Sequence, residues 1–435
     1  MRIKFMRTAI VAGTAAVAGL ATASPALAAP IPTVQVPCRV SALASAISGA
    51  SNGAVLRLAS CTYVLTSELP MITKRLTLQG GPATTIERSY AGSTPHFSLL
   101  NVAGGSLTVT NVNFKNGYAP TEGGAIDGED GPVSVTGGTF TGNYAGEYGG
   151  AIWNDEGLTV TGATFTGNSA ADYGGAIDNE DTTSISGSAF TGNTSEYGGA
   201  LENDHDVTLA NSTFTSNSSS EYGGAFYDDG GVTTVNKGTF LKNSSVYGGA
   251  IEDEGDGIVV NNSYFQQNTA ISEGGAIADY ESLTLNNDIF NYNFGPEYGG
   301  AVYTDDGASI RGVTLKGNQA TYGGGLYNDD DMTLTGGSFT SNTADYGGGL
   351  YNEDEATVDG TTFQQNSAST AGGGIYEDGT FAHLYSSRVM FNHAPSGEGG
   401  GIYNNDSVTL AYTVVRFNTA NNCSPALSVT GCPAP

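Results

Sequence analysis

Apolar and polar positions alternate in short runs along most of the chain, and the pattern returns about every 25 residues. In one such unit Val160 stands between Thr159 and Thr161, a phenylalanine follows at Phe165, and the sequence GGAI begins at Gly174. Alternation with a period of two predicts short strands, and no part of the unit has a helical period. Each unit therefore predicts three short strands separated by three turns.

Two motifs recur in step through these units. The glycine motif GG[AG][ILVF] begins at Gly123, Gly149, Gly174, Gly198, Gly223, Gly248, Gly274, Gly299, Gly323, Gly347, Gly372 and Gly399. The motif F-x-x-N lies at Phe140/Asn143, Phe165/Asn168, Phe190/Asn193, Phe214/Asn217, Phe240/Asn243, Phe265/Asn268, Phe290/Asn293, Phe339/Asn342 and Phe363/Asn366. Self-similarity at a fixed spacing indicates a solenoid.

A single unit cannot bury its own apolar face, so the units must stack. Parallel stacking at about 4.8 Å puts Phe on Phe, Ile on Ile and Asn on Asn, and the Asn column can form an amide ladder. Gly162 or Asn211, three residues before the Phe, suits a left-handed corner, and the paired glycines suit close backbone packing. The expected fold is all-β, a single-stranded right-handed parallel β-helix.

The two ends of the chain depart from the repeat. Val40, Leu43 and Ile47 have helical spacing, which predicts a short capping helix at the N-terminal end. The open strand edges of a solenoid need such covers. We expect an export signal over 1–28, an N-terminal cap with irregular first coils over 29–103, the β-helix over 104–420, and a disulfide-closed loop over 421–435.

The N-terminal segment has the features of a secretory signal peptide. Arg2, Lys4 and Arg7 precede a small-residue apolar run that ends at the Ala-x-Ala sequence 26–28. Later apolar runs are too short to cross a membrane. The expected location is therefore secreted, either extracellular or at the cell surface, with no integral membrane segment after the signal is removed.

Charge and cysteines agree with an exported chain. The sequence has 43 acidic and 15 basic residues and a formal net charge of −28, which disfavours nucleic acid and anionic membranes as partners. The four cysteines form one pair at each end, Cys38 with Cys61 and Cys423 with Cys432. An even number in an exported chain predicts disulfides rather than a redox or zinc site.

The combined repeat resembles known families. The alternation of GGA[ILV] with F-x-x-N over 104–418 resembles the passenger repeats of chlamydial polymorphic outer membrane proteins, which are adhesins. With its capping helix, its CTYVLT segment and its NNCSPALSVTGC ending, the chain is also similar to secreted actinobacterial right-handed parallel β-helix repeat proteins. The resemblance implies the fold and an adhesive or structural surface role, with surface glycans or cell-envelope components as partners.

The most regular polar feature is acidic. Six and seven residues after each glycine pair stand carboxylates that stacking turns into two stripes. The best-formed part of these stripes is predicted at Asp305, Asp306, Asp329, Asp330, Glu353 and Asp354. Rows of neighbouring carboxylates can ligate Ca²⁺, so a weak cation-binding ladder is one interpretation. A solvated turn that keeps the protein soluble is the other.

Two further hypotheses concern glycans. Many parallel β-helices are pectin-active enzymes, and a polysaccharide-active, pectate-lyase-like enzyme or a glycan-binding module is the alternative to a structural role. The best enzymatic candidates are in the last coils, at Asp378, His383, Arg388, His393, Asp406 and Arg416. A tyrosine column, which precedes the glycine pairs from Tyr148 to Tyr346, is either a stacked ladder or a platform for sugars. No catalytic residue is assigned.

Overall fold

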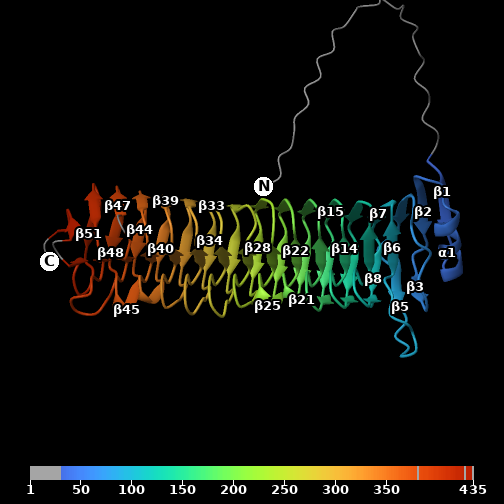
Figure 1. Ribbon diagram of the computed structural model, residues 1–435, viewed down its shortest axis with the longest axis horizontal. Helices are drawn as coiled ribbons and strands as arrows, with labels where there is room; N and C mark the ends of the chain where they lie inside the picture. Colours follow the sequence, from blue (N-terminus) through green and yellow to red (C-terminus); the bar gives the residue numbers. More distant parts are fainter. Residues whose placement is uncertain (1–30, 380–381, 426–427, 434–435) are drawn as a thin grey trace, which may run out of the picture. The chain divides into compact units, whose positions relative to one another are not determined.

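In the described residues the strands of each coil pair in parallel with the equivalent strands of the coils before and after (Figure 1). Tyr118 also forms a single antiparallel bridge, with Phe97. Val135, for example, pairs with Val109 on one side and Val160 on the other. The computed structural model describes residues 31–379, 382–425 and 428–433. The expected signal peptide lies outside the described residues. The predicted parallel β-helix is confirmed.

Three long sheets form the faces of the solenoid. Sheet A comprises β1 (Thr33–Val36), β2 (Ala54–Leu58), β4 (Arg75–Gln79), β7 (Ser106–Thr110), β11 (Val133–Thr136), β15 (Leu158–Thr161), β19 (Thr183–Ser186), β23 (Val207–Ala210), β27 (Thr233–Asn236), β30 (Ile258–Asn261), β33 (Leu283–Asn286), β36 (Ala308–Arg311), β39 (Met332–Thr335), β43 (Ala356–Asp359), β47 (Ala382–Tyr385), β50 (Val408–Ala411) and β53 (Val429–Thr430). Sheet B comprises β3 (Thr62–Leu65), β5 (Thr85–Arg88), β8 (Asn113–Lys115), β12 (Thr139–Thr141), β16 (Thr164–Thr166), β20 (Ala189–Thr191), β24 (Thr213–Thr215), β28 (Thr239–Leu241), β31 (Tyr264–Gln266), β34 (Ile289–Asn291), β37 (Thr314–Lys316), β40 (Ser338–Thr340), β44 (Thr362–Gln364), β48 (Arg388–Met390) and β51 (Val414–Arg416).

Sheet C follows the glycine motif in each coil. It comprises β6 (Leu100–Ala103), β10 (Ile126–Glu129), β14 (Ile152–Asn154), β18 (Ile177–Asn179), β22 (Leu201–Asn203), β26 (Phe226–Asp228), β29 (Ile251–Asp253), β32 (Ile277–Asp279), β35 (Val302–Thr304), β38 (Leu326–Asn328), β42 (Leu350–Asn352), β46 (Ile375–Glu377), β49 (Ile402–Asn404) and β52 (Cys423–Ser424). Short strands between sheets B and C are β9 (Tyr118–Ala119), β13 (Tyr144–Ala145), β17 (Ser169–Ala170), β21 (Thr194–Tyr197), β25 (Ser218–Tyr222), β41 (Thr343–Tyr346) and β45 (Ser367–Ala371).

The interior is filled by columns of identical side chains. The rings from Phe114 to Phe290 are fully buried and stack with neighbouring centroids 4.6 to 5.0 Å apart. Beside them runs the predicted amide ladder, in which Asn143 Nδ2 donates to Asn168 Oδ1 at 2.9 Å and each later Asn repeats the bond. The Asn side chains also bond backbone groups of adjacent coils, so the ladder satisfies buried polar atoms and fixes the register.

Most coils have left-handed backbone at three places, one of which is the first residue of the glycine motif, such as Gly174 with a φ of 56°. Gly162 and Asn211, at the predicted position before the Phe, have φ of 63° and 50°. A second left-handed corner, two residues after the Phe, is occupied by Gly167 but also by Lys242 and Phe391. The sequence indicated only the first corner because the second has no preferred residue type.

Both ends carry the predicted disulfides, Cys38–Cys61 and Cys423–Cys432. The helix α1 (Val40–Gly49) buries Leu43 and contacts β1, β2 and β3, as expected for an N-terminal cap. Strand β1 precedes the helix and extends sheet A, which the sequence did not predict. At the other end β52 and β53, within the predicted loop 421–435, extend sheets C and A.

Candidate functional site

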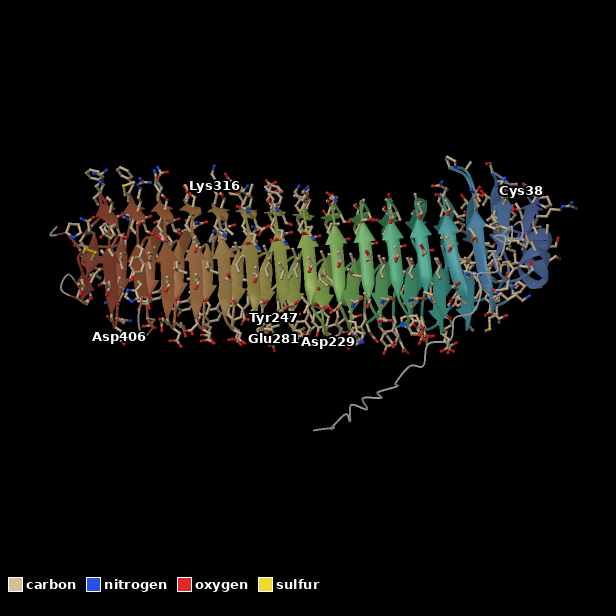
Figure 2. All side chains as sticks on the ribbon, turned by 90° about the horizontal axis from the view of Figure 1, so that it is seen from above. Cys38, Asp229, Tyr247, Glu281, Lys316 and Asp406 are labelled. Atoms are coloured by element: carbon tan, nitrogen blue, oxygen red, sulfur yellow. A yellow bond between two sulfur atoms is a disulfide. The ribbon has the colours of Figure 1, made fainter. Side chains whose placement is uncertain are left out.

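The predicted acidic stripes lie in the turns between sheet C and sheet A. Figure 2 shows Asp229, Glu281 and Asp406 along one long edge of the solenoid, with Lys316 on the opposite edge. Asp229 directly follows a sheet C strand, Glu281 and Asp406 lie one residue further along, and the sheet C strands share one register. Parallel stacking therefore aligns the turn residues of successive coils. We call these turns, from residue 129 to residue 406, the acidic edge.

Asp305, Asp329 and Glu353 directly follow three successive sheet C strands in register, so their carboxyls form a row. Partial burial, followed by the neighbouring carboxylates, raises the pKa of Asp305 and of Asp329. Tyrosines of sheet C brace the row: Tyr303 Oη donates to Asp305 at 3.3 Å, and Tyr327 Oη donates to Glu353. The row is thus held in place by the fold.

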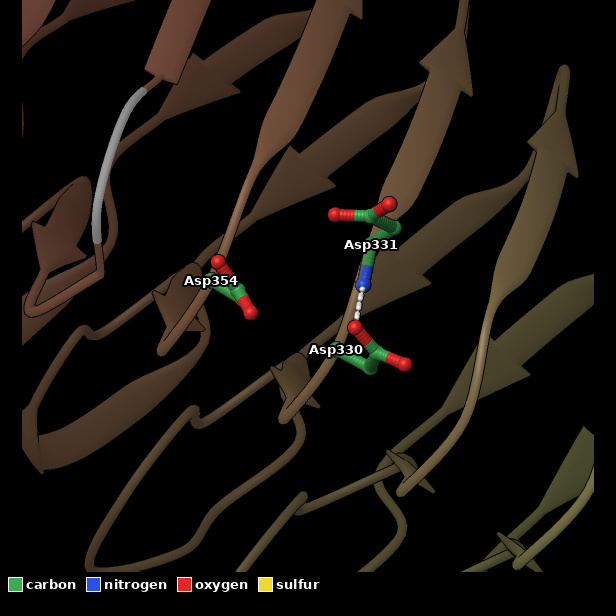
Figure 3. Close-up of side chains that lie close together, drawn as sticks. All are labelled: Asp330, Asp331 and Asp354. Carbon is green, nitrogen blue, oxygen red and sulfur yellow. Dashed lines mark hydrogen bonds between the residues drawn. The ribbon is translucent and has the colours of Figure 1, made fainter.

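Three further acids of these turns lie close together. Asp330, Asp331 and Asp354 each direct one carboxylate oxygen to a common region, and these three oxygens lie within 4.8 Å of one another (Figure 3). The backbone N–H of Asp331 donates to Asp330 at 2.8 Å. Asp306, the remaining residue of the predicted ladder, instead accepts the N–H of Gly307 at 2.7 Å. Such a cluster of oxygens can ligate a hard cation. Sequence reasoning missed Asp331 because it lies one residue after the second of the two predicted stripes.

Tyrosines cover the outside of sheet C in two columns. The predicted column contains the pairs Tyr148–Tyr173 and Tyr322–Tyr346, with centroids 5.5 and 5.3 Å apart. A second column was not predicted. It consists of Tyr303, Tyr327, Tyr351, Tyr376 and Tyr403. The rings cover one another's faces, which supports the ladder interpretation and leaves little aromatic face for sugars.

In some N-terminal coils, carboxyls occupy the position of this second tyrosine column. Asp178 and Glu202 are paired in register on neighbouring strands of sheet C, and each is only 3% exposed. They line a cavity of about 240 Å³ together with Tyr148, Tyr173 and three acids of the acidic edge. Burial, then nearby carboxylates, raises both pKa values well above the ordinary range. Sequence reasoning missed this pair, since its position holds Asp, Trp, Glu, Tyr or Ala in different coils.

The enzymatic candidates of the last coils are separated. His383 is on sheet A, Arg388 and Arg416 are on sheet B, and Asp378 and Asp406 are in the acidic edge. His393 lies between sheets B and C, where its backbone pairs with Ser367. These residues therefore do not form one site.

The fold and the edge can now be compared with known families. Residues 148–320 match the right handed beta helix region, and residues 137–155 and 360–376 match the Chlamydia polymorphic membrane protein repeat. The chain is a right-handed parallel β-helix with polymorphic membrane protein repeats. The comparison with curated proteins finds no match.

These matches fit a surface repeat protein. In the part of the β-helix that the structure describes, no helix is long and apolar enough to span a membrane. The disulfides at both ends fit an oxidising, extracellular environment.

The buried carboxyls predict that the β-helix is more stable in mild acid than in base. Burial raises the pKa of Glu252 to about 10 and of Glu377 to about 8. The folded chain therefore holds protons that the unfolded chain has already released, and this stability is lost as pH rises through the folded pKa values. The melting temperature should fall between pH 6 and 10, both limits approximate, in calorimetry at constant ionic strength.

Glu377→Gln provides the matched control, because its amide keeps the hydrogen-bonding shape without the titration. In the native protein, Asn352 Nδ2 donates a hydrogen bond to Glu377 Oε1 at 3.0 Å. The variant should show a flatter melting profile below about pH 8. An equal slope in both proteins would exclude Glu377 as a source of the pH dependence.

Proposed function

We propose that this β-helix is a secreted or cell-surface structural protein of the adhesin type, and that its acidic edge binds divalent cations. The observation that carries the proposal is the regular alignment of carboxylates along one edge, braced by tyrosine hydroxyls at Asp305 and Glu353. A surface that repeats from coil to coil suits many weak, equivalent contacts rather than one reaction. The family matches support the surface role.

Divalent cations would give this edge its adhesive character. Carboxylates at the spacing of stacked strands repel one another, and a bound Ca²⁺ removes that repulsion while leaving coordination positions open. The open positions can accept hydroxyl or carboxylate oxygens of surface glycans or cell-envelope polymers. Adhesion would then depend on millimolar calcium.

We expect calcium to stabilise the protein more than sodium does at equal ionic strength. Each independent site adds RT ln(1+[L]/Kd), or about 1.4 kcal/mol at ten times Kd. The measurement is the melting temperature in about 10 mM calcium chloride against sodium chloride of matched ionic strength. Sodium controls for the general screening of the negative charge.

An edge variant, Asp329→Asn/Asp330→Asn/Asp354→Asn, tests whether the response comes from the acidic edge. These residues lie in turns with partly or fully exposed side chains, so the fold should persist. The variant should lose part of the calcium-specific rise in melting temperature. Identical melting temperatures of the native protein in the two salts would exclude specific calcium binding and would leave solubility as the role of the acidic edge.

The cavity beside Asp178 and Glu202 favours a second candidate function, the binding of glycans that carry free amino groups. Its lining combines five carboxyls with Tyr148 and Tyr173, so a cationic amine would be attracted where a neutral sugar would not. Titration calorimetry with chitosan oligosaccharides, against their N-acetylated counterparts, tests this function. Equal heats for the two sugars would exclude it.

A further inference from the structure

Sheet B carries the opposite charge to the acidic edge. Although the chain has 43 acidic residues, no described strand of sheet B from β8 to β51 contains one. The basic residues at the ends of these strands are Lys115, Lys316, Arg388 and Arg416. Figure 2 shows Lys316 on the edge opposite to Asp229, Glu281 and Asp406. Sheet B is therefore a face that an acidic partner can approach without local repulsion.

The last two coils add exposed apolar side chains to this face. Arg388 pairs in register with Val414, and both side chains are exposed. Phe391 and Phe417 follow the two strands, are 50% and 61% exposed, and stack with their ring centroids 5.3 Å apart. The guanidinium carbon of Arg416 lies 5.0 Å from the centre of the Phe417 ring. We call the following six residues the C-terminal patch: Arg388, Phe391, Tyr412, Val414, Arg416 and Phe417.

Three aromatic residues of the patch occupy backbone that disfavours them. Phe391, Tyr412 and Phe417 have φ of 58°, 54° and 61°, in the left-handed region that bulky residues rarely adopt. The corner of Phe391 and Phe417 is occupied by Gly142 and Gly167 in other coils. Tyr412 is 94% exposed, so its ring packs on little of its own chain. Strained residues of this kind persist where a contact offsets their cost, which indicates a contact made outside the chain.

We propose that the C-terminal patch docks onto the acidic edge of a second copy of this chain. Arg388 and Arg416 lie in successive coils, and the acidic edge also presents carboxylates in successive coils, so the two surfaces share one repeat. A guanidinium pairs with a carboxylate through two parallel N–H donors. Phe391 and Phe417 can cover tyrosines that border the edge, such as Tyr327, whose hydroxyl donates to Glu353.

Charge selects this pairing of surfaces over the alternatives. Two acidic edges repel each other, and two C-terminal patches would bring arginines against arginines. The formal net charge of −28 repels whole copies at a distance, but physiological salt screens that repulsion beyond about 8 Å. Because the patch and the edge lie on different sides of one molecule, the contact can repeat from copy to copy instead of closing as a dimer. This inference goes beyond the proposed function, since it needs the carboxylates of the edge but no bound cation.

The test compares the full chain with a patch variant, Arg388→Thr/Phe391→Gly/Tyr412→Gly/Arg416→Thr/Phe417→Gly. Glycine suits the left-handed corners and threonine suits strands, so this variant should fold, which circular dichroism checks. Gln365→Gly is the matched control, because Gln365 is exposed at the same left-handed corner of the preceding coil, with φ of 56°. Should the patch variant not fold, Arg388→Thr/Arg416→Thr takes its place with the same expectation.

Association is measured by sedimentation velocity in about 0.15 M sodium chloride with EDTA, which keeps the result independent of divalent cations. We expect the average mass of the native protein to rise with concentration up to about 0.1 mM, and to pass the mass of a dimer. The patch variant should associate at least about tenfold more weakly, because aromatic and arginine residues dominate such contacts. The Gln365→Gly control should associate like the native protein.

A mixing experiment identifies the surface that the patch contacts. A fluorescently labelled patch variant retains its acidic edge, so it should sediment with the complexes that unlabelled native protein forms. A patch that binds another patch would instead leave the labelled variant monomeric.

Three results would overturn the proposal. The first is a native protein that stays monomeric over the whole concentration range. The second is equal association of the native protein and the patch variant, or an equal loss in the Gln365→Gly control. The third is a labelled patch variant that stays monomeric beside native complexes. None of them bears on cation binding by the acidic edge, which the melting temperatures in calcium and sodium test separately.

Discussion

Replacing Gly249 with alanine is expected to destabilise the β-helix severely. A Cβ at this position would lie 2.2 Å from the carbonyl oxygen of Gly275 and 2.7 Å from the carbonyl carbon of Thr269, both in the next coil. Those atoms belong to backbone that is hydrogen-bonded to the Gly249 coil, so they cannot withdraw without opening the stack. We expect a loss of about 3 kcal/mol or more in the free energy of unfolding, measured by denaturant titration.

Gly157→Ala is the matched control for this experiment. Gly157 lies in a turn where an added Cβ would meet no atom within 4 Å, and its backbone is not left-handed. The control should therefore unfold at nearly the native denaturant concentration. Similar losses in the two variants would show that conformational freedom, and not the close approach of coils, is what the glycine pairs provide.

Asn243→Ala is expected to be comparably damaging, since it removes four buried hydrogen bonds at once. Asn243 Nδ2 donates to Phe214 O at 3.1 Å and to Asn268 Oδ1 at 3.0 Å, and its Oδ1 accepts two bonds from Asn217. Each buried polar group left without a partner costs about 1 to 3 kcal/mol. A total loss of about 4 kcal/mol should appear as a lower denaturation midpoint.

A second Asn ladder offers the control. Asn261 Oδ1 accepts a hydrogen bond from Asn286 Nδ2 at 3.0 Å, and Asn261 Nδ2 donates to Asn236 Oδ1 at 3.2 Å. Asn261 is the last residue of strand β30 in sheet A, and its side chain is only half-buried. Water can replace those bonds, so Asn261→Ala should cost about 1 kcal/mol. Equal effects at the two positions would contradict the view that burial makes the inner ladder valuable.

The inward-facing half of the fold could be predicted from the sequence because packing allows few residue types there. Phe165 and Asn168 stack on copies of themselves, so their spacing recurs and predicts both the coil and its register. The turn acids also recur at a fixed distance from the glycine pairs. Elements without repetition were missed, including β1, which joins sheet A ahead of the capping helix.

The outward-facing position of sheet C could not be predicted in the same way. Asp178, Glu202 and Tyr327 occupy equivalent places without sharing a residue type. They are buried because tyrosines from the preceding turn fold over them, which only the structure shows. The buried Asp228, Asp253 and Asp279 are different: they stand two residues after the last residue of the glycine motif, where six other coils have Asn. Aligning that position would have exposed the substitution.

The equivalence of the columns also bears on how such a gene can change in length. Because Phe240 stacks on Phe265 much as Phe165 stacks on Phe190, deleting or duplicating one whole unit joins surfaces that already fit. Stability in a solenoid is close to a sum over units and their nearest-neighbour contacts. Unequal recombination between repeats can therefore produce longer or shorter variants that still fold.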